Sequence, residues 1–301
     1  MAFLATKNLL MLHGGVGGQS QHSSILDKYA RESIMTKTAN DAVVDSVVKM
    51  EDNPIFNAGT GSYMRIDGSI QMDAAVMTES GFGSVIAVEK IKNPVLLARD
   101  VMEKTPHLIM SGDGAIRLAR FLGYPEHNPV TDKAIEQFQK YRSAKSQGDV
   151  DNERYRSLKA MGDISPLERS TDTVGAVAYI NGKFAAAVST GGATPMLRGR
   201  VGDSPLPGSG IYCGNKGAVV ATGYGEEIIK HLLCYRVYER IGSDSLSNIM
   251  QDLTADFKGP VGLIAISSTE CRSYSNKPMP VGYFLAITCC NYRTLITTIN
   301  P

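Results

Sequence analysis

The sequence predicts a fold of the α+β class, in which antiparallel sheets are sandwiched between layers of helices. Apolar runs typical of strands occur in adjacent pairs, at 70–77 with 84–89 and at 173–180 with 183–190. A short turn separates the members of each pair, which is the pattern of antiparallel strands. Helical segments stand between these pairs rather than between single strands, so a doubly wound parallel sheet is disfavoured.

The first half of the chain begins with a strand. Residues 9–12 are apolar and run into a glycine-rich loop at His13–Gly18. Residues 24–50 show helical periodicity, and Asn53-Pro54 stops the predicted helix. One face of this helix carries Ala39, Ala42, Val43, Ser46 and Val47. A compact turn region at 57–62 separates the helix from the first strand pair.

Three shorter elements precede a change in composition. Pro94 suits the first position of a helix that extends to Lys104. A brief strand is expected at 107–110 and a further helix at 112–121. Residues 124–170 are charged and poor in aliphatic side chains, which predicts an exposed, mobile connector that is helical in parts.

The segment after this connector predicts a β-hairpin. Asn181-Gly182 lies between two apolar runs, which is the strongest short signal for a two-residue turn. Such a turn pairs Ile180 with Lys183 and, counted back, Thr173 with Thr190, at a position where side chains come closest. Two hydroxyls then meet at the open end of the hairpin, as a nucleophile and a polarising group would. Taken alone, the hairpin is explained better by threonines that only support the ladder.

The remaining elements follow the hairpin. Residues 199–208 form a loop rich in glycine and proline, and 218–222 form a strand. Residues 225–241 predict one helix, and a strand at 263–267 is expected to be the last of the core. The apolar positions of that helix include Ile228, Leu232, Tyr235 and Val237. The apolar tail at 283–301 fits a covering strand, a dimer contact or an irregular segment.

The composition argues against several classes of function. A net charge of +1 and a pI of about 7.6 give no basis for binding nucleic acid or acidic membranes. No apolar run approaches the roughly 20 residues of a transmembrane helix, and the N-terminus is interpreted as a strand rather than a signal peptide. Five cysteines without a CxxC pair favour reduced thiols in a cytoplasmic protein. The five histidines are scattered, so a zinc enzyme is not expected.

Two segments carry groups suited to catalysis or to amino-acid binding. Thr222–Glu226 lies where a strand ends and a helix starts, so the Thr222 hydroxyl and free backbone N–H groups could stabilise an oxyanion. Arg200 and Asp203 offer a guanidinium and a carboxylate, which suit the two charges of an α-amino acid. An ordinary strand–helix turn and a surface salt bridge are the respective alternatives.

Two glycine-containing loops have weaker signals. The Asn53–Gly61 loop could present backbone carbonyls to a hard cation, or it could be a plain turn. The His13–Gly18 loop lacks the Gly-Lys-Ser/Thr ending of a phosphate loop, so nucleotide binding is disfavoured.

Together these segments resemble the plant-type L-asparaginase/isoaspartyl peptidase family of the N-terminal nucleophile hydrolases. Seven motifs occur in the family's order and spacing across residues 9–241. They are His13-Gly-Gly, Asn53-Pro-Ile-Phe-Asn57-Ala-Gly, Met72-Asp-Ala-Ala-Val-Met77, Asp172-Thr-Val-Gly-Ala-Val-Ala178, Ser189-Thr-Gly-Gly192, Gly199-Arg-Val-Gly-Asp-Ser-Pro205 and Ala221-Thr-Gly-Tyr-Gly-Glu226. One such motif is weak evidence, but seven in order make coincidence implausible.

The resemblance implies a four-layer αββα sandwich, formed by a single domain of residues 1–301. It implies a precursor that cuts itself between Asp172 and Thr173. The products would be an α subunit, 1–172, with a mobile linker from about 124 to 172, and a β subunit, 173–301. Two such αβ units are expected to form a dimer.

The resemblance also implies roles for individual residues. Thr173 would be the nucleophile, Thr190 would hydrogen-bond to it, and Thr222 with Gly223 would form the oxyanion hole. Arg200 would hold the substrate α-carboxylate, while Asp203 and the Gly225 carbonyl would hold the α-ammonium, and Asn57 would also contact the substrate. No catalytic cofactor is implied. A structural sodium ion would bind carbonyls of Met50, Glu51, Asn53, Phe56, Ala58 and Thr60.

The substrates implied are asparagine and β-aspartyl dipeptides, but two departures keep alternatives open. Asp172 stands where the asparaginase branch usually has glycine, and aspartate there is typical of glycosylasparaginases, which act on glycosylated asparagine. The end of the chain, from Ser275 onward, also differs from the family pattern. A third reading is an uncleaved, non-catalytic protein of the same fold that binds amino acids.

Overall fold

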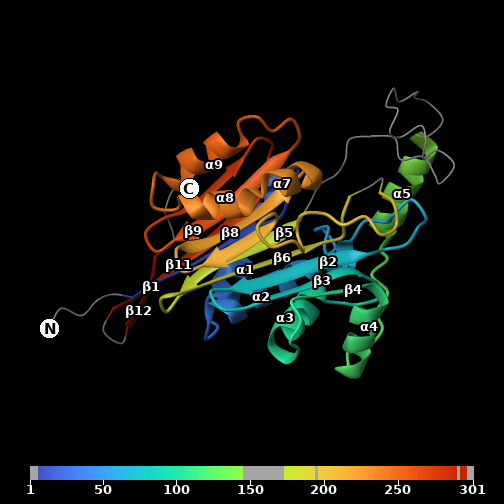
Figure 1. Ribbon diagram of the computed structural model, residues 1–301, viewed down its shortest axis with the longest axis horizontal. Coiled ribbons are helices and arrows are strands. Elements are labelled where there is room, and N and C mark those ends of the chain that lie inside the picture. The colour runs from blue at the N-terminus through green and yellow to red at the C-terminus, as the bar shows by residue number, and fades with distance from the viewer. Residues whose placement is uncertain (1–5, 145–172, 194–195, 290–291, 297–301) are drawn as a thin grey trace.

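The computed structural model describes residues 6–144, 173–193, 196–289 and 292–296 (Figure 1). Two sheets dominate it, one of eight strands and one of four. The larger sheet has the order β12 (Tyr292–Ile296), β11 (Val281–Cys289), β1 (Thr6–His13), β5 (Val174–Ile180), β6 (Lys183–Thr190), β2 (Met72–Thr78), β3 (Phe82–Val88), β4 (Ile109–Ser111). The smaller sheet has the order β10 (Cys271–Ser275), β9 (Val261–Ser267), β8 (Gly217–Gly223), β7 (Ile211–Gly214). All neighbours are antiparallel except β3 and β4, in agreement with the α+β class.

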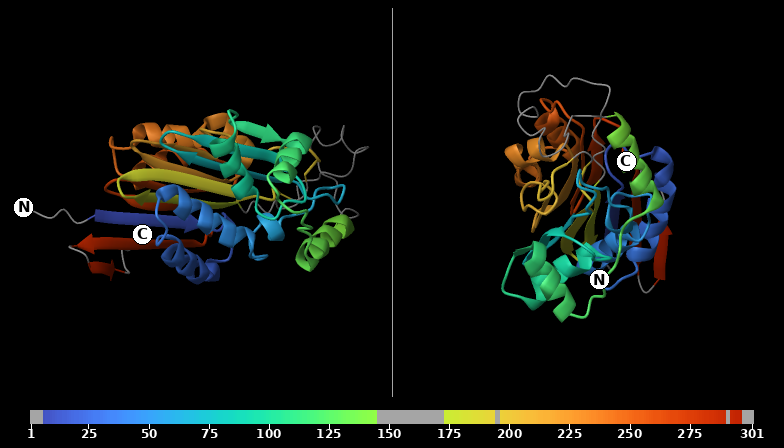
Figure 2. Two further views of the ribbon diagram at one scale, coloured as in Figure 1. Left: turned by 90° about the horizontal axis from the view of Figure 1, so that it is seen from below. Right: turned by 90° about the vertical axis from the view of Figure 1, so that its right-hand side faces the viewer.

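Helices cover the sheets on their outer sides, as Figures 1 and 2 show. Before the hairpin, the described residues form the helices α1 (Ser23–Ser33), α2 (Ala39–Glu51), α3 (Pro94–Lys104), α4 (Gly112–Phe121) and α5 (Asp132–Ala144). Those after it are α7 (Gly225–His231), α8 (Leu233–Arg240) and α9 (Leu246–Thr254). Two short 3₁₀ turns lie at Ser20–His22 and Gly59–Gly61.

Three apolar clusters form the core. The first lies between helices α1 to α4 and the larger sheet, and the third lies between α8, α9 and the smaller sheet. The second lies between the two sheets. Strand β1 shows why both faces of the larger sheet are buried: Leu10 and Leu12 contribute to the first cluster, while Leu9 and Met11 contribute to the second.

The hairpin has the predicted register. Ile180 pairs with Lys183 and Val174 with Ser189, so Thr173 and Thr190 are next in line. Asn181 and Gly182 have φ of 53° and 76°, the left-handed conformations that a tight hairpin turn requires. Because β5 and β6 lie in the middle of the larger sheet, the open end of the hairpin is buried.

The prediction of a single helix over 24–50 is wrong in one respect, because the structure has two helices in this segment. The chain leaves α1 after Ser33, and Thr38 starts α2 by accepting a hydrogen bond of 3.0 Å from the Asp41 backbone. The predicted face of the second part is buried, as expected. The helices predicted at 94–104 and 112–121 are confirmed with those bounds.

The helix predicted at 225–241 is also divided. Leu232 adopts φ of 46° and ψ of 48°, which ends α7, and α8 starts at the next residue. The assignment of Leu232 to an apolar face is therefore wrong, because its side chain is 50% exposed, whereas Leu233 is fully buried. A single left-handed residue shifts the helical phase that the periodicity assumed.

The strand at 263–267 is not the last, since β10, β11 and β12 follow it. Strand β11 lies beside β1, with Leu285 opposite Leu9, so the first part of the apolar tail completes the larger sheet. In the connector, α5 lies at 132–144, while the expected mobile part at 145–172, with the cleavage residue Asp172, lies outside the described residues. None of the helices described is long and apolar enough to cross a membrane.

Candidate active site

Thr173 lies where the two sheets come together at the open end of the hairpin. Its side chain is buried, and its backbone nitrogen lies 3.4 Å from the hydroxyl of Thr222, at the end of β8. The same Thr222 hydroxyl accepts a hydrogen bond of 3.3 Å from the backbone of Val16, in the glycine-rich loop. Three segments that are far apart in the sequence therefore converge at the backbone of Thr173.

The Thr173 hydroxyl contacts a residue that sequence reasoning did not single out. Its Oγ1 lies 3.3 Å from Oγ of Ser204, a fully buried residue directly after Asp203. The Ser84 hydroxyl anchors this loop by donating to the carbonyl of Pro205 at 2.8 Å. Ser204 is part of the Gly199–Pro205 motif, so the motif was the available signal.

Thr190 is buried beside Thr173 in the hairpin register. Its hydroxyl accepts a hydrogen bond of 3.0 Å from the Gly192 backbone. The hydrogen bond expected between the Thr173 and Thr190 hydroxyls stays a prediction, because the Thr173 hydroxyl contacts Ser204 and the Thr190 hydroxyl accepts from Gly192.

Arg200, Asp203 and Gly225 converge next to Thr222. A Cβ on Gly225 would lie 2.8 Å from Oδ1 of Asp203 and 2.9 Å from a terminal nitrogen of Arg200, so only glycine leaves this space open. Arg200 donates to both carboxylate oxygens of Glu226, at 3.1 and 2.9 Å. Arg200 thus forms its ion pair with Glu226. The alternative interpretation, a surface salt bridge between Arg200 and Asp203, is not supported by the structure.

Asp203 has a free carboxylate oxygen in this cluster. The residue is 4% exposed, and Oδ2 has no hydrogen-bond partner among the described residues. Burial raises the pKa of Asp203 to about 7, while Arg200 opposes this rise. A buried carboxylate of this kind is stabilised by an added cation or N–H donor.

A second pair of buried charges lies under the Arg200 loop, and sequence reasoning missed it. The fully buried Arg65 donates to the carbonyls of Arg200 and Gln71, both at 3.0 Å. Burial lowers the pKa of Arg65 to about 10 and raises that of Asp73, whose Oδ1 accepts from the Ala87 backbone at 2.7 Å. Attraction between Arg65 and Asp73 supports the base of the loop.

His13 lies behind Thr173 and is fully buried. Its Nδ1 accepts a hydrogen bond of 3.3 Å from the Gly15 backbone, and burial lowers its pKa to about 3, so the ring is neutral at pH 7. A Cβ on Gly175 would lie 2.3 Å from Nε2, so glycine lets the hairpin pack against this ring.

Asn57 joins the 53–61 loop to the end of the hairpin. Its amide donates to the Gly192 carbonyl at 2.5 Å, its side-chain oxygen accepts from Tyr63 at 3.0 Å, and its own carbonyl accepts from Gly191 at 2.9 Å. These bonds place the loop next to Thr190. The expected contact of Asn57 with substrate stays a prediction.

The same loop fits a hard cation by its donor set. A Cβ on Gly59 would lie 2.5 Å from the Glu51 carbonyl oxygen, and one on Gly61 would lie 1.8 Å from that of Phe56, so the glycines let the chain close over these oxygens. Backbone N–H groups bind three of the other expected ligands, the carbonyls of Met50, Asn53 and Ala58. The carbonyls of Asn53 and Ala58 each keep a second lone pair for an ion such as sodium, whereas that of Met50 also accepts from the Asp52 backbone.

Residues 18–275 match a family model described as asparaginase. The chain belongs to the asparaginase family. This match covers the hairpin and every candidate site residue from Met50 to Gly225. The glycine-rich loop begins just before the matched region.

Curated relatives of this asparaginase chain cover most of its length. It is 34% identical over 291 residues to a plant-type L-asparaginase of Pyrococcus horikoshii, covering 91% of this chain and 94% of the relative. It is 41% identical over 238 residues to an isoaspartyl peptidase/L-asparaginase of Danio rerio, with 74% and 72% covered. The human isoaspartyl peptidase/L-asparaginase is 38% identical over 244 residues, with 77% and 74% covered.

The asparaginase site thus combines three kinds of group at one end of the two sheets. Thr173 supplies a hydroxyl, Thr222 supplies a hydroxyl on the opposite sheet, and Arg200 with Asp203 supplies two opposite charges. A small zwitterion with a side-chain carbonyl matches this set of groups.

Proposed function

We propose that this chain is a threonine amidohydrolase that converts L-asparagine to L-aspartate and ammonia and cleaves β-aspartyl dipeptides. The observation that carries the proposal is the convergence of Thr173, Thr222 and the Arg200–Asp203–Gly225 cluster. The names of the relatives, L-asparaginase and isoaspartyl peptidase, support it.

In the proposed reaction, the Thr173 hydroxyl attacks the side-chain carbonyl of the substrate. The α-amine that Thr173 gains on cleavage of the chain accepts the hydroxyl proton and then gives it to the leaving group. The Thr222 hydroxyl and the Gly223 backbone N–H stabilise the oxyanion. Ammonia or an amino acid leaves, and water then hydrolyses the ester to release aspartate.

The charged cluster orients the substrate for this attack. The α-carboxylate binds Arg200, whose guanidinium is already held by both oxygens of Glu226. The α-ammonium binds the Asp203 oxygen that lacks a partner among the described residues, together with the Gly225 carbonyl. The added cation offsets the unfavourable burial of the Asp203 charge.

The active form requires cleavage between Asp172 and Thr173, which yields subunits 1–172 and 173–301 of one domain. In the uncleaved chain, the Thr173 nitrogen is an amide that donates to Thr222, and cleavage would turn it into an amine at the same place. The same proposal includes four further features. They are the αββα arrangement of layers, a dimer of αβ units, a structural sodium ion in the 53–61 loop and a cytoplasmic location. The apolar clusters on both sides of each sheet support that arrangement.

The intact mass of purified protein, followed over several days, tests cleavage first. Two fragments, 1–172 and 173–301, together with ammonia release from asparagine and aspartate release from a β-aspartyl dipeptide, are the expected result. Cleaved protein that releases neither product would overturn the proposed activity. An uncut chain that binds aspartate without turnover would favour the non-catalytic binding protein.

A glycosylasparaginase is the second candidate, and Asp172 is the observation that favours it. The same cleaved protein should be given a glycosylated asparagine at equal concentration. A larger kcat/KM for this substrate than for asparagine would select the second candidate. Replacement of Asp172 by glycine then tests whether the residue affects only the rate of self-cleavage.

A further inference from the structure

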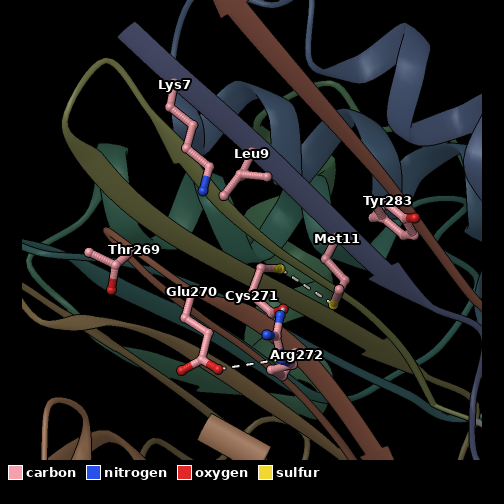
Figure 3. Close-up of a pocket in the computed structure, with 8 residues that line it drawn as sticks. All are labelled: Lys7, Leu9, Met11, Thr269, Glu270, Cys271, Arg272 and Tyr283. Carbon is pink, nitrogen blue, oxygen red and sulfur yellow. Dashed lines mark hydrogen bonds and ion pairs between the residues drawn. The ribbon is translucent and has the colours of Figure 1, made fainter. Parts of the chain in front are cut away.

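A cavity lies at the end of β1 opposite to the candidate active site. It has a volume of about 170 Å³ and opens between the larger sheet and the strand β10 of the smaller one (Figure 3). Lys7 lines it at the start of β1, whereas His13 at the end of the same strand lies behind Thr173. Six residues of extended chain separate Lys7 from His13 by about 20 Å, while Met11, at the inner end of the cavity, lies about 7 Å from His13 along the strand.

The inner wall of the cavity is apolar. Leu9 and Met11 from β1 are 2% exposed, and Cys271 from β10 lies against them with its sulfur 3.6 Å from that of Met11. Burial raises the pKa of the Cys271 thiol to about 12, so it is neutral at pH 7. The volume suits a group about as large as benzene, which fills an apolar cavity of roughly 150 Å³.

The rim of the cavity carries one positive charge that no acidic group among the described residues neutralises. Arg272 lies 3.4 Å from Glu270, which also accepts a hydrogen bond of 2.9 Å from Leu246 at the start of α9. These two charges cancel each other. Lys7 has no ion-pair partner among the described residues, and Figure 3 shows its side chain extending from β1 towards Cys271 and Thr269.

We propose that this cavity binds a small monocarboxylate with a compact apolar body. The body lies on Leu9 and Met11, and the carboxylate pairs with the ammonium of Lys7. A neutral ligand of the same shape loses the ion pair, and a second anionic group would lie near Glu270. The reaction proposed for Thr173 uses none of these residues, so the cavity is a separate site.

Benzoate is the probe for the test, and the full-length protein labelled at its methionine methyl groups is titrated with it. The expected result is a saturable shift of the Met11 methyl signal, assigned by a Met11→Leu variant. Benzamide, which has the same ring without the charge, is expected to bind about fivefold more weakly, as the loss of one partly exposed ion pair implies. Equal binding of benzamide, or no shift of this signal, would overturn the proposal.

Variants separate this cavity from the active site. Lys7→Met removes the charge, keeps an unbranched side chain only one atom shorter, and should weaken benzoate binding about fivefold. Lys216→Met removes an exposed cation elsewhere, beside Tyr238, and should leave binding unchanged. Arg200→Ala, which removes the carboxylate-binding group of the active site, should also leave the Met11 shift unchanged, and loss of the shift there would contradict a separate site.

Discussion

The hydroxyl of Thr173 lies 3.3 Å from the hydroxyl of Ser204, and both residues are buried. This contact links the proposed nucleophile, at the end of the larger sheet, to the loop that carries Arg200 and Asp203. This hydrogen bond therefore couples the proposed nucleophile directly to the loop proposed to bind the substrate.

Replacing Ser204 by alanine should lower kcat for asparagine about fivefold and leave KM nearly unchanged. One lost hydrogen bond to the nucleophile corresponds to about 1 kcal/mol, and the substrate charges bind elsewhere. Steady-state kinetics on fully cleaved protein measure both constants. Ser209→Ala, at a buried serine of the same loop, is the matched control. A rise in KM alone would mean that Ser204 acts on substrate binding.

Thr173→Ala should abolish both self-cleavage and hydrolysis, because it removes the hydroxyl that attacks in both steps, and without the cut no free α-amine forms. Thr173→Ser keeps both groups and should retain activity at a reduced rate. Mass spectrometry follows cleavage, and ammonia release follows turnover. Turnover by the alanine variant would overturn the assignment of the nucleophile.

Arg200→Ala should raise KM for asparagine by about 30- to 150-fold, since a charge-assisted hydrogen bond is worth roughly 2–3 kcal/mol. Self-cleavage should continue, because Arg200 binds Glu226 rather than Thr173. The measurement is KM together with the fraction cleaved after a fixed time. If cleavage also stopped, Arg200 would be needed for folding of the loop.

Local patterns predicted the parts of the fold and the site that depend on neighbours in sequence. The Asn181-Gly182 turn determines the register of the hairpin, and that register brings Thr173 beside Thr190. The division at Leu232 could not be predicted, because an apolar residue in a left-handed conformation has no composition signal. Strand β11 was missed as a core strand because its partner, β1, is more than 260 residues away.

The same distinction applies inside the site. Thr222 and Arg200 stand in glycine-containing motifs that suggest their chemistry. Ser204 lies in a motif, but its contact with Thr173 and the contact of Arg65 with the Arg200 carbonyl join segments that are far apart in the sequence, so the motifs do not reveal these contacts. The three-dimensional packing adds the groups that hold the motifs in place.

The affinity for asparagine should fall as the pH drops below about 7. Asp203 must be ionised to bind the substrate ammonium, and burial raises its pKa to about 7 in the free protein. KM measured from pH 5.5 to 8.5 should therefore rise towards low pH. Asp203→Asn should raise KM at pH 8 and remove this pH dependence, and a variant that kept the dependence would assign it to another group.

Glu51 should make the protein less stable as the pH rises from about 4.5 to 8. The side chain is fully buried, and burial raises its pKa to about 8 from an ordinary value of 4.5. In this window the folded protein holds a proton that the unfolded chain has lost, so the free energy of unfolding decreases with increasing pH.

Glu51→Gln should reduce this dependence, because its amide oxygen can still accept the hydrogen bond of 3.0 Å from Val95 that starts α3, while no charge has to be buried. Urea unfolding at pH 5 and pH 8 is the measurement, made in the Thr173→Ala background so that the chain stays in one piece. Asp45→Asn, at a partly exposed carboxylate on the same helix, is the control and should change the slope little. If the Glu51 variant kept the full slope, the buried carboxylate would already be ionised at pH 5, and a positive group near it would have to compensate its charge.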